Sequence, residues 1–188
     1  MINNYLLYII ILFVSKIGFG IYKSTGNENN DKLYPVPPKT EKLLFYVQRS
    51  HNRNTIVYDL NTMTNGEINL KEPIHPYWIR YEEGGNREEL TYLQRKYAYG
   101  LNLISADKKN ESFIFNFICY KKRNIYLMRT GDKHRFKACM FVNGTLAALN
   151  KIFIKHEDGL LFHPVVKYLD ISGIEIKTGI EVKERLIP

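Results

Sequence analysis

The sequence lacks the local motifs that mark the common classes of enzyme. Its 188 residues contain no G-x-S-x-G, G-x-G-x-x-G, G-x-x-x-x-G-K-[ST] or H-E-x-x-H, so nothing indicates a nucleophile elbow, a nucleotide-binding loop or a zinc protease. No two of the five histidines are two or four residues apart, the spacing that puts two ligands on one face of a strand or helix. We expect no metal, no cofactor and no identifiable catalytic residue, and favour a non-enzymatic protein.

Cysteine is also scarce, since the chain has only Cys119 and Cys139. In an exported chain two cysteines suggest a disulfide. A meander is expected here, however, in which Cys119 lies opposite Tyr126 and Tyr126 lies opposite Lys137. The cysteines are then about two strand spacings of ~4.8 Å apart, beyond the Cα separation that a disulfide accepts. We expect two free, buried thiols.

Long apolar runs are absent except for residues 5–14 near the start of the chain. The length of this run suits the hydrophobic region of a signal peptide, and Gly18 and Gly20 supply small residues before a cleavage site. A single-pass membrane anchor is the alternative. Lys16 interrupts the run well before the roughly 20 apolar residues that a span needs, so we predict an exported protein, periplasmic or secreted.

This prediction divides the chain into three parts. Residues 1–20 are the signal peptide, and residues 21–41, which are rich in Asn and Pro, are a flexible leader. Residues 42–188 are long enough for one domain and short for two. If the first segment is not cleaved, it is the only part expected to contact a membrane.

Aromatic residues, in contrast, are abundant, with 14 tyrosines and 10 phenylalanines, and they fit the pleated surface of a sheet. Most of the chain alternates between apolar and polar residues, the period of a half-buried strand. We therefore predict a mainly β fold: an antiparallel β-barrel or strongly curved sheet of eight to ten strands with one packed α-helix. The expected strands are 43–48, 55–60, 74–82, 113–120, 125–129, 134–142, 151–156, 165–171, 173–176 and 179–187.

The helix is predicted over about 86–100. Asn86 is the expected N-cap, with Glu89 three residues later, and Gly100 is the expected C-terminal cap. An apolar stripe with helical spacing would pack on the sheet; it comprises Leu90, Leu93, Tyr97 and Leu101.

Basic charge is concentrated in one window, residues 108–137, which has nine Lys and Arg against two acidic residues. The window is either a solvated face or a site for an acidic glycan or anionic lipid; nucleic acid is not expected for an exported protein. In the expected register Ile118, Leu127 and Phe136 lie opposite one another and face the core. The candidate anion-binding residues are Lys121, Lys122 and Arg123 on one turn and Arg135 and Lys137 at the other end.

A second candidate site is the polar and aromatic cluster of His75, Trp78, Arg80, Arg95 and Tyr99. Alternation along the strand places Trp78 and Arg80 on one face and His75 on the other. Arg80 beside Trp78 could form a cation–π pair or meet an anionic ligand. The structural alternative is a pair that closes the mouth of a barrel.

Several of these segments resemble a family of small exported bacterial proteins catalogued as domain of unknown function 4833. The resemblance covers about residues 42–188 and rests on LFYVQRS at 44–50, NTIVY at 54–58, PIHPYWIRY at 73–81 and QRKYAYG at 94–100. It implies an exported single domain, with no activity and no catalytic residues to carry over. Three functions therefore stay open: a binding module for an anionic or amphipathic envelope ligand, an enzyme acting on envelope polymers through the Arg/Tyr/His cluster, and a protein-interaction domain.

Overall fold

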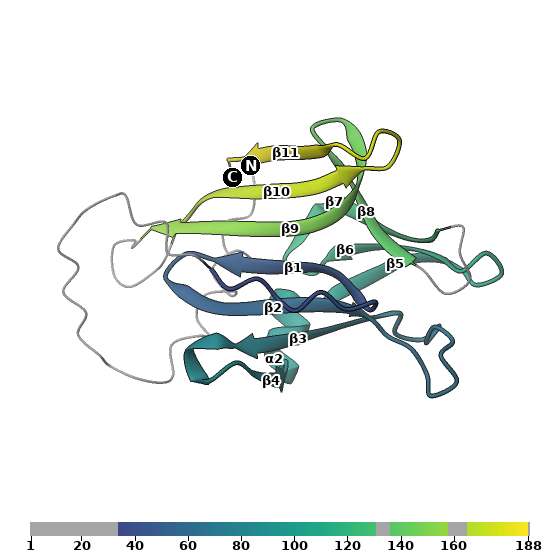
Figure 1. The fold of residues 1–188 in the computed structure, drawn as a ribbon, viewed down its shortest axis with the longest axis horizontal. Coiled ribbons are helices and arrows are strands. Elements are labelled where there is room, and N and C mark those ends of the chain that lie inside the picture. Colours follow the sequence, from purple (N-terminus) through teal and green to yellow (C-terminus); the bar gives the residue numbers. More distant parts are fainter. Residues whose placement is uncertain (1–33, 131–135, 158–164, 188) are drawn as a thin grey trace.

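Strands dominate the computed structural model, which describes residues 34–130, 136–157 and 165–187 (Figure 1). The predicted signal peptide and most of the predicted leader lie outside these ranges. In chain order the strands are β1 (Leu43–Arg49), β2 (Asn52–Leu60), β3 (Ile74–Arg80), β4 (Asn86–Glu89), β5 (Leu101–Asp107), β6 (Ser112–Phe117), β7 (Tyr120–Arg129), β8 (Phe136–Val142), β9 (Thr145–Glu157), β10 (Val165–Glu175) and β11 (Glu181–Leu186). A short 3₁₀ turn, Tyr81–Glu83, follows β3.

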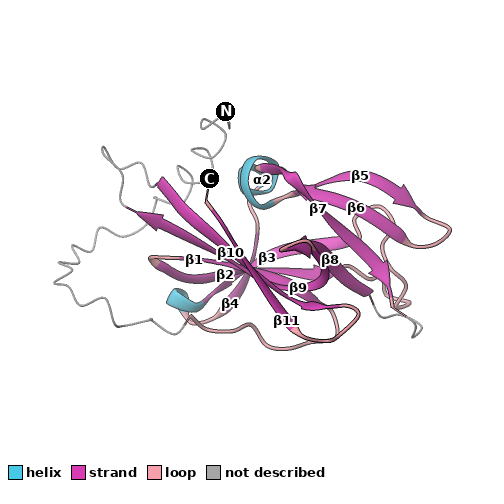
Figure 2. Cartoon of the chain, turned by 90° about the horizontal axis from the view of Figure 1, so that it is seen from above, coloured by secondary structure: helices cyan, strands magenta, loops and turns pink. Residues whose placement is uncertain are grey.

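The strands form one strongly curved sheet in the order β4-β3-β2-β1-β9-β8-β7-β6-β5. Neighbours pair antiparallel, apart from the parallel pair β1 and β9. The long strand β9 pairs through its first part with β8, through its later part with β1, and along its other edge with β10, which carries β11. Figure 2 shows the resulting half-barrel. The predicted strongly curved β-sheet with one helix is confirmed, and the helix is shorter than the predicted 86–100.

The helix links the two edge strands of this path, β4 and β5. It comprises α2 (Tyr92–Gln94) and a continuing π-helical turn, Arg95–Tyr99. Thr91 is the N-cap and forms a capping box with Gln94, which satisfies two backbone donors at the helix start.

The predicted start of the helix at Asn86 is therefore wrong. Asn86–Glu89 form β4, because the edge of β3 offers backbone partners to this segment. The predicted apolar stripe is only partly right: Leu90 is buried and Leu101 packs against the core, but Leu93 and Tyr97 are exposed. The buried side chains of the helix are Gln94, Ala98 and Tyr99.

Gly100 ends the helix as predicted, for a different physical reason. Its backbone is extended and not left-handed. A Cβ at this position would lie 1.9 Å from the carbonyl oxygen of Arg95, so the close approach of two backbone segments requires glycine.

The register of the meander differs from the prediction. A two-residue turn at Ile118 and Cys119 joins β6 to β7, so Phe113 lies opposite Leu127 where Ile118 was expected. This shift is an odd number of residues, which turns the other face of β6 inward. The buried residues of β6 are consequently Phe113, Phe115 and Phe117.

The pairing of β7 with β8 also slips. Ala138 lies opposite Leu127, and Cys139 lies opposite Tyr126. This shift is even, because Phe136 was expected opposite Leu127 and Ala138 is two residues further on. Leu127 therefore stays buried as predicted, together with Ala138 and Met140 of β8.

The concave face of the sheet holds the main core. Trp78, Tyr58, Phe45 and Phe113 are its largest fully buried side chains, and the Phe45 and Tyr58 rings stack with centroids 4.4 Å apart. A smaller cluster on the opposite, outer face comprises Tyr46, Val57, Tyr77 and Ile79.

The last residues of the leader pack against this outer face. The Gln48 Nε2 donates to the carbonyl of Pro35 at 2.7 Å, and the Tyr81 hydroxyl donates to that of Val36 at 3.3 Å. This part of the predicted leader therefore has defined partners on the sheet. Within the described ranges, no helix has the length and apolar character needed to cross a bilayer.

Candidate functional site

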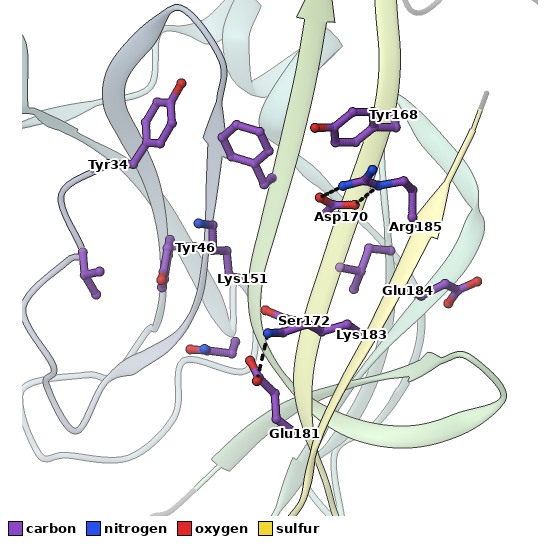
Figure 3. A pocket seen from close by; sticks show the side chains of 14 residues that line it. Tyr34, Tyr46, Lys151, Tyr168, Asp170, Ser172, Glu181, Lys183, Glu184 and Arg185 are labelled. Atoms are coloured by element: carbon purple, nitrogen blue, oxygen red, sulfur yellow. Dashed lines mark hydrogen bonds and ion pairs between the residues drawn. The ribbon is translucent and has the colours of Figure 1, made fainter. Parts of the chain in front are cut away.

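A cleft of about 870 Å³ opens on the outer face, between the leader and strands β1, β9, β10 and β11 (Figure 3). Strand alternation decides which side chains reach it. Tyr46 of β1 and Lys151 and Phe153 of β9 point into the cleft, and their strand neighbours Val47 and Ile152 point into the half-barrel.

Aromatic side chains form much of the wall of this cleft. Tyr34 of the leader meets Phe153 edge to face, with ring centroids 5.2 Å apart. Tyr46 on β1 also lines the cleft. Tyr168 on β10 packs against Arg185, whose guanidinium carbon is 3.8 Å from the centre of the Tyr168 ring. The leader thus completes a site that the strands alone would leave open on one side.

Most charged groups in the cleft are paired within the chain. Arg185 donates to both carboxylate oxygens of Asp170 at 2.7 Å, and Lys183 lies 3.0 Å from a carboxylate oxygen of Glu181. These pairs neutralise the charge on the β11 side of the cleft.

Lys151 differs from these cations, because its ammonium has no ion pair within the part of the chain that the structure describes. Its Nζ lies 5.3 Å from the centre of the Phe153 ring. Partial burial lowers the pKa of Lys151; the negative charge of Asp170 opposes this shift and the positive charge of Lys183 adds to it. Lys151 is therefore a half-buried donor available to an anionic group.

The opposite face of the same strands carries a smaller apolar slot of about 60 Å³. Val47, Ile152, Ile154, Leu169 and Tyr99 are among its lining residues. Neither this slot nor its surroundings were predicted as a site.

Arg49 lies on the slot side of β1, at the end of that strand. Its Nη1 donates to the Tyr99 hydroxyl at 3.1 Å, and its guanidinium carbon is 5.2 Å from the centre of the Trp78 ring. Tyr58 also contributes, because its hydroxyl donates to the Tyr99 carbonyl at 2.8 Å. The buried aromatic residues thus hold a guanidinium at the core of the domain.

The predicted cluster around Trp78 is brought together, but as packed core. Trp78 is fully buried and its Nε1 donates to Gln94 at 3.3 Å. Arg80 lies 4.9 Å from the Trp78 ring centre and binds both carboxylate oxygens of Glu88, at 2.7 and 3.1 Å. Arg80 is therefore already neutralised.

His75 and Arg95 lie apart from Trp78 in the structure. The His75 Nε2 is 2.8 Å from a carboxylate oxygen of Glu89, and Arg95 lies 2.6 Å from Glu72 and 3.6 Å from Glu89. Among the described pockets, none contains His75 or Arg80. His75 therefore stands beside a carboxylate, but it lines neither the outer cleft nor the apolar slot.

The predicted basic site is divided by the structure. Lys121, Lys122 and Lys137 are exposed, and Arg135 lies outside the described residues. Arg123, placed on a turn by the sequence, is within β7 and donates to both carboxylate oxygens of Glu184. Its pKa is raised, first by this hydrogen-bonded contact.

Both cysteine thiols are free. Burial raises the pKa of Cys119 to about 12 and that of Cys139 to about 11. Neither is therefore a ready thiolate nucleophile.

Sequence reasoning missed Lys151 and Arg49, the two cations whose surroundings are unusual. Both occur in alternating strand segments that look ordinary. Their lack of a carboxylate partner depends on which side chains the other strands bring near, and no local pattern reports that.

Comparison with known proteins identifies the family only. The family model described as Domain of unknown function (DUF4833) matches residues 45–185. This match spans more than half of the chain, which therefore belongs to that family. Neither the curated proteins nor the solved structures gave a match.

Proposed function

We propose that this member of the DUF4833 family is an exported, non-enzymatic binding module whose outer cleft binds an acidic glycan. The observation that carries the proposal is the Lys151 ammonium, half-buried beside the Phe153 ring and without an ion pair in the described ranges. A cation in this position gains more from an anionic ligand than an exposed lysine does, because less water competes for it.

The rest of the cleft favours a sugar over a lipid tail. Aromatic faces at Tyr34, Tyr46 and Phe153 can pack against the C–H faces of sugar rings, and the ion pairs of Arg185 and Lys183 offer polar groups along the same wall. A mixture of apolar surface with a few placed polar groups is typical of ligand pockets. A lipid tail would place methylene groups against those ion pairs.

The test is a calorimetric titration with oligogalacturonate and, as a neutral control, the matching galactan oligomer. We expect saturable binding of the acidic oligomer only, weakening with added salt because exposed charges are screened over about 10 Å at 0.1 M. Lys151→Met should weaken binding at least about tenfold, since a charge-assisted hydrogen bond contributes roughly 1.5–3 kcal/mol.

Lys183→Met is the matched control, because it also removes one lysine from the cleft wall but one already paired with Glu181. Its effect should be much smaller than that of Lys151→Met. Equal binding of both oligomers, or an affinity unchanged by Lys151→Met, would contradict the proposal.

The exposed lysines of the basic window, residues 108–137, are the alternative binding site for the acidic glycan. If Lys121→Glu/Lys122→Glu or Arg135→Glu/Lys137→Glu abolishes binding while Lys151→Met does not, the site is on the β6–β8 meander. Binding to anionic liposomes in place of the glycan would make a lipid head group the ligand.

A further inference from the structure

Arg49 is a buried cation without a counterion in the described residues. It is only 6% exposed. Its Nη1 is bonded to the Tyr99 hydroxyl, but Nε and Nη2 have no hydrogen-bond partner there. A buried charge left unpaired costs several kcal/mol, so such a group is rarely kept without a use.

The two unpartnered nitrogens form one edge of the guanidinium, and this edge is the one that binds carboxylates elsewhere in the chain. Arg80 uses Nε and Nη2 to hold both oxygens of Glu88. Arg185 uses the same two atoms to hold both oxygens of Asp170. The parallel N–H groups of this edge match the spacing of carboxylate oxygens.

The neighbours of Arg49 hold its guanidinium while leaving this edge unsatisfied. Trp78 contributes a cation–π contact at 5.2 Å. The Tyr99 hydroxyl accepts a hydrogen bond from Arg49 and keeps its own proton for another acceptor. This contact is made at Nη1, on the far side of the guanidinium from the Nε–Nη2 edge, so that edge stays open to a carboxylate.

The apolar slot lies close to this group, although Arg49 is not itself one of its lining residues. Tyr99 lines the slot, as do Val47, two residues before Arg49 on the same face of β1, and Ile154, the register partner of Arg49 on β9. Its 60 Å³ accommodate roughly four to six heavy atoms, if one water needs about 10–15 Å³. That is the size of a short alkyl chain.

We propose that the half-barrel has a second, interior site for a short aliphatic monocarboxylate. The Nε and Nη2 of Arg49 bind the carboxylate, and the alkyl tail occupies the apolar slot. This site lies on the opposite face of β1 and β9 from Lys151, so it is independent of the outer cleft.

Access to this site requires side-chain movement. The unpartnered nitrogens are shielded from solvent in the structure, so neighbouring side chains must shift before a carboxylate reaches them. The observed affinity is the intrinsic affinity multiplied by the fraction of molecules in the open arrangement. We also expect association to be slower than the diffusion limit.

The experiment uses hexanoate as the probe, with hexan-1-ol and acetate as controls for the tail and the carboxylate. Binding is followed by the side-chain ¹⁵N–¹H signal of Arg49 Nε and by calorimetry. We expect hexanoate to shift this signal and to bind at least about tenfold more tightly than either control, a factor equivalent to about 1.4 kcal/mol.

Three variants test the assignment. Arg49→Met should abolish hexanoate binding. Tyr99→Phe, which keeps the ring but removes the hydroxyl that holds Nη1 of Arg49, should weaken it several-fold. Arg185→Met removes a guanidinium from the outer face and should leave it unchanged. If Arg49→Met does not fold, Arg49→Lys replaces it, because lysine keeps the charge but lacks the two-donor edge.

The proposal is overturned if wild-type protein shows no saturable binding of hexanoate, or if the Arg49 variant and wild type bind it equally. Lys151→Met separates this result from the outer cleft. It should bind hexanoate normally, and the Arg49 variant should still bind the acidic glycan.

Discussion

At the scale of single residues, the unusual feature of this domain is its buried polar side chains, and Asp59 is one of them. Asp59 is 9% exposed; its Oδ2 accepts from the Tyr77 hydroxyl at 2.9 Å, and its Oδ1 has no hydrogen-bond partner in the described residues. Burial raises the pKa of Asp59, against the opposing effects of the Tyr77 hydrogen bond and nearby cations. Burial, with Asp59 adding to it, also raises the pKa of Tyr77 to about 12.

Asp59→Asn should therefore stabilise the protein near neutral pH. The folded-state pKa of Asp59 lies above its unfolded value, so the wild-type residue favours folding most at acidic pH and loses that contribution as pH rises through the folded pKa. Asparagine has no charge to bury and can still accept from Tyr77. The melting temperature of the variant minus that of wild type should be near zero at low pH and positive at pH 7.

Asp170→Asn supplies the control, because Asp170 is held by two hydrogen bonds from Arg185 on the surface. This variant should be no more stable than wild type at pH 7. A pH-independent difference for Asp59→Asn would show that its carboxylate is not penalised by burial.

At the scale of secondary structure, the parallel pair β1 and β9 positions both proposed sites. Alternation sends Lys151 to the outer cleft and Ile152 to the slot. Because β9 pairs with three strands, a one-residue change in its register would turn Lys151 and Phe153 together to the other face of the sheet. The helix completes the interior, since it supplies Tyr99.

The helix start provides a direct test at this scale. Thr91→Ala should lower the free energy of unfolding by about 1 kcal/mol, because the Thr91 hydroxyl accepts from the Gln94 N–H. Asn86→Ala should change it by less than about 0.5 kcal/mol, as exposed positions usually do. Urea denaturation measures both, and the reverse order of effects would restore the helix start at Asn86.

At the scale of the whole molecule, the ends of the curved sheet differ in their protection. The exposed edge strand β4 carries Arg87, Glu88 and Glu89, which discourage pairing with another chain. The other edge of the path, β5, exposes Leu103 and Ile104. The described domain begins where the leader reaches the outer face, so cleavage before Ile21 would leave the cleft intact.

Export is the prediction that concerns the whole chain. Protein recovered outside the cytoplasm should begin at Ile21, because Gly18 and Gly20 supply the small residues of a cleavage site. Intact mass spectrometry measures the start directly. Recovery of the full-length chain only in the membrane fraction would favour the anchor.

Local chemistry in the sequence was sufficient to predict the class of fold. Alternating aromatic and polar residues required half-buried strands, and turn residues separated them, so a curved sheet followed. The end of the helix at Gly100 was also predictable, because glycine is common just after the last turn of a helix. The close approach of the Arg95 carbonyl oxygen, which requires glycine here, was not predictable. The start of the helix was not predictable, because Asn86 and Thr91 are both good N-cap residues. Residues 86–89 form a strand because they pair with the free edge of β3, and this pairing exists only in the folded chain.

Only the tertiary structure decided the register of the meander and the partners of its charges. The short turn at Ile118 and Cys119 set the inward face of β6, and Glu184, 61 residues away, neutralised Arg123. Lys151 and Arg49 became candidates because neither forms an ion pair with a carboxylate among the described residues. Strand propensity depends on residues that are neighbours in the sequence. Register and ion pairing depend on residues that come into contact only when the chain folds, and no local pattern in the sequence reports those contacts.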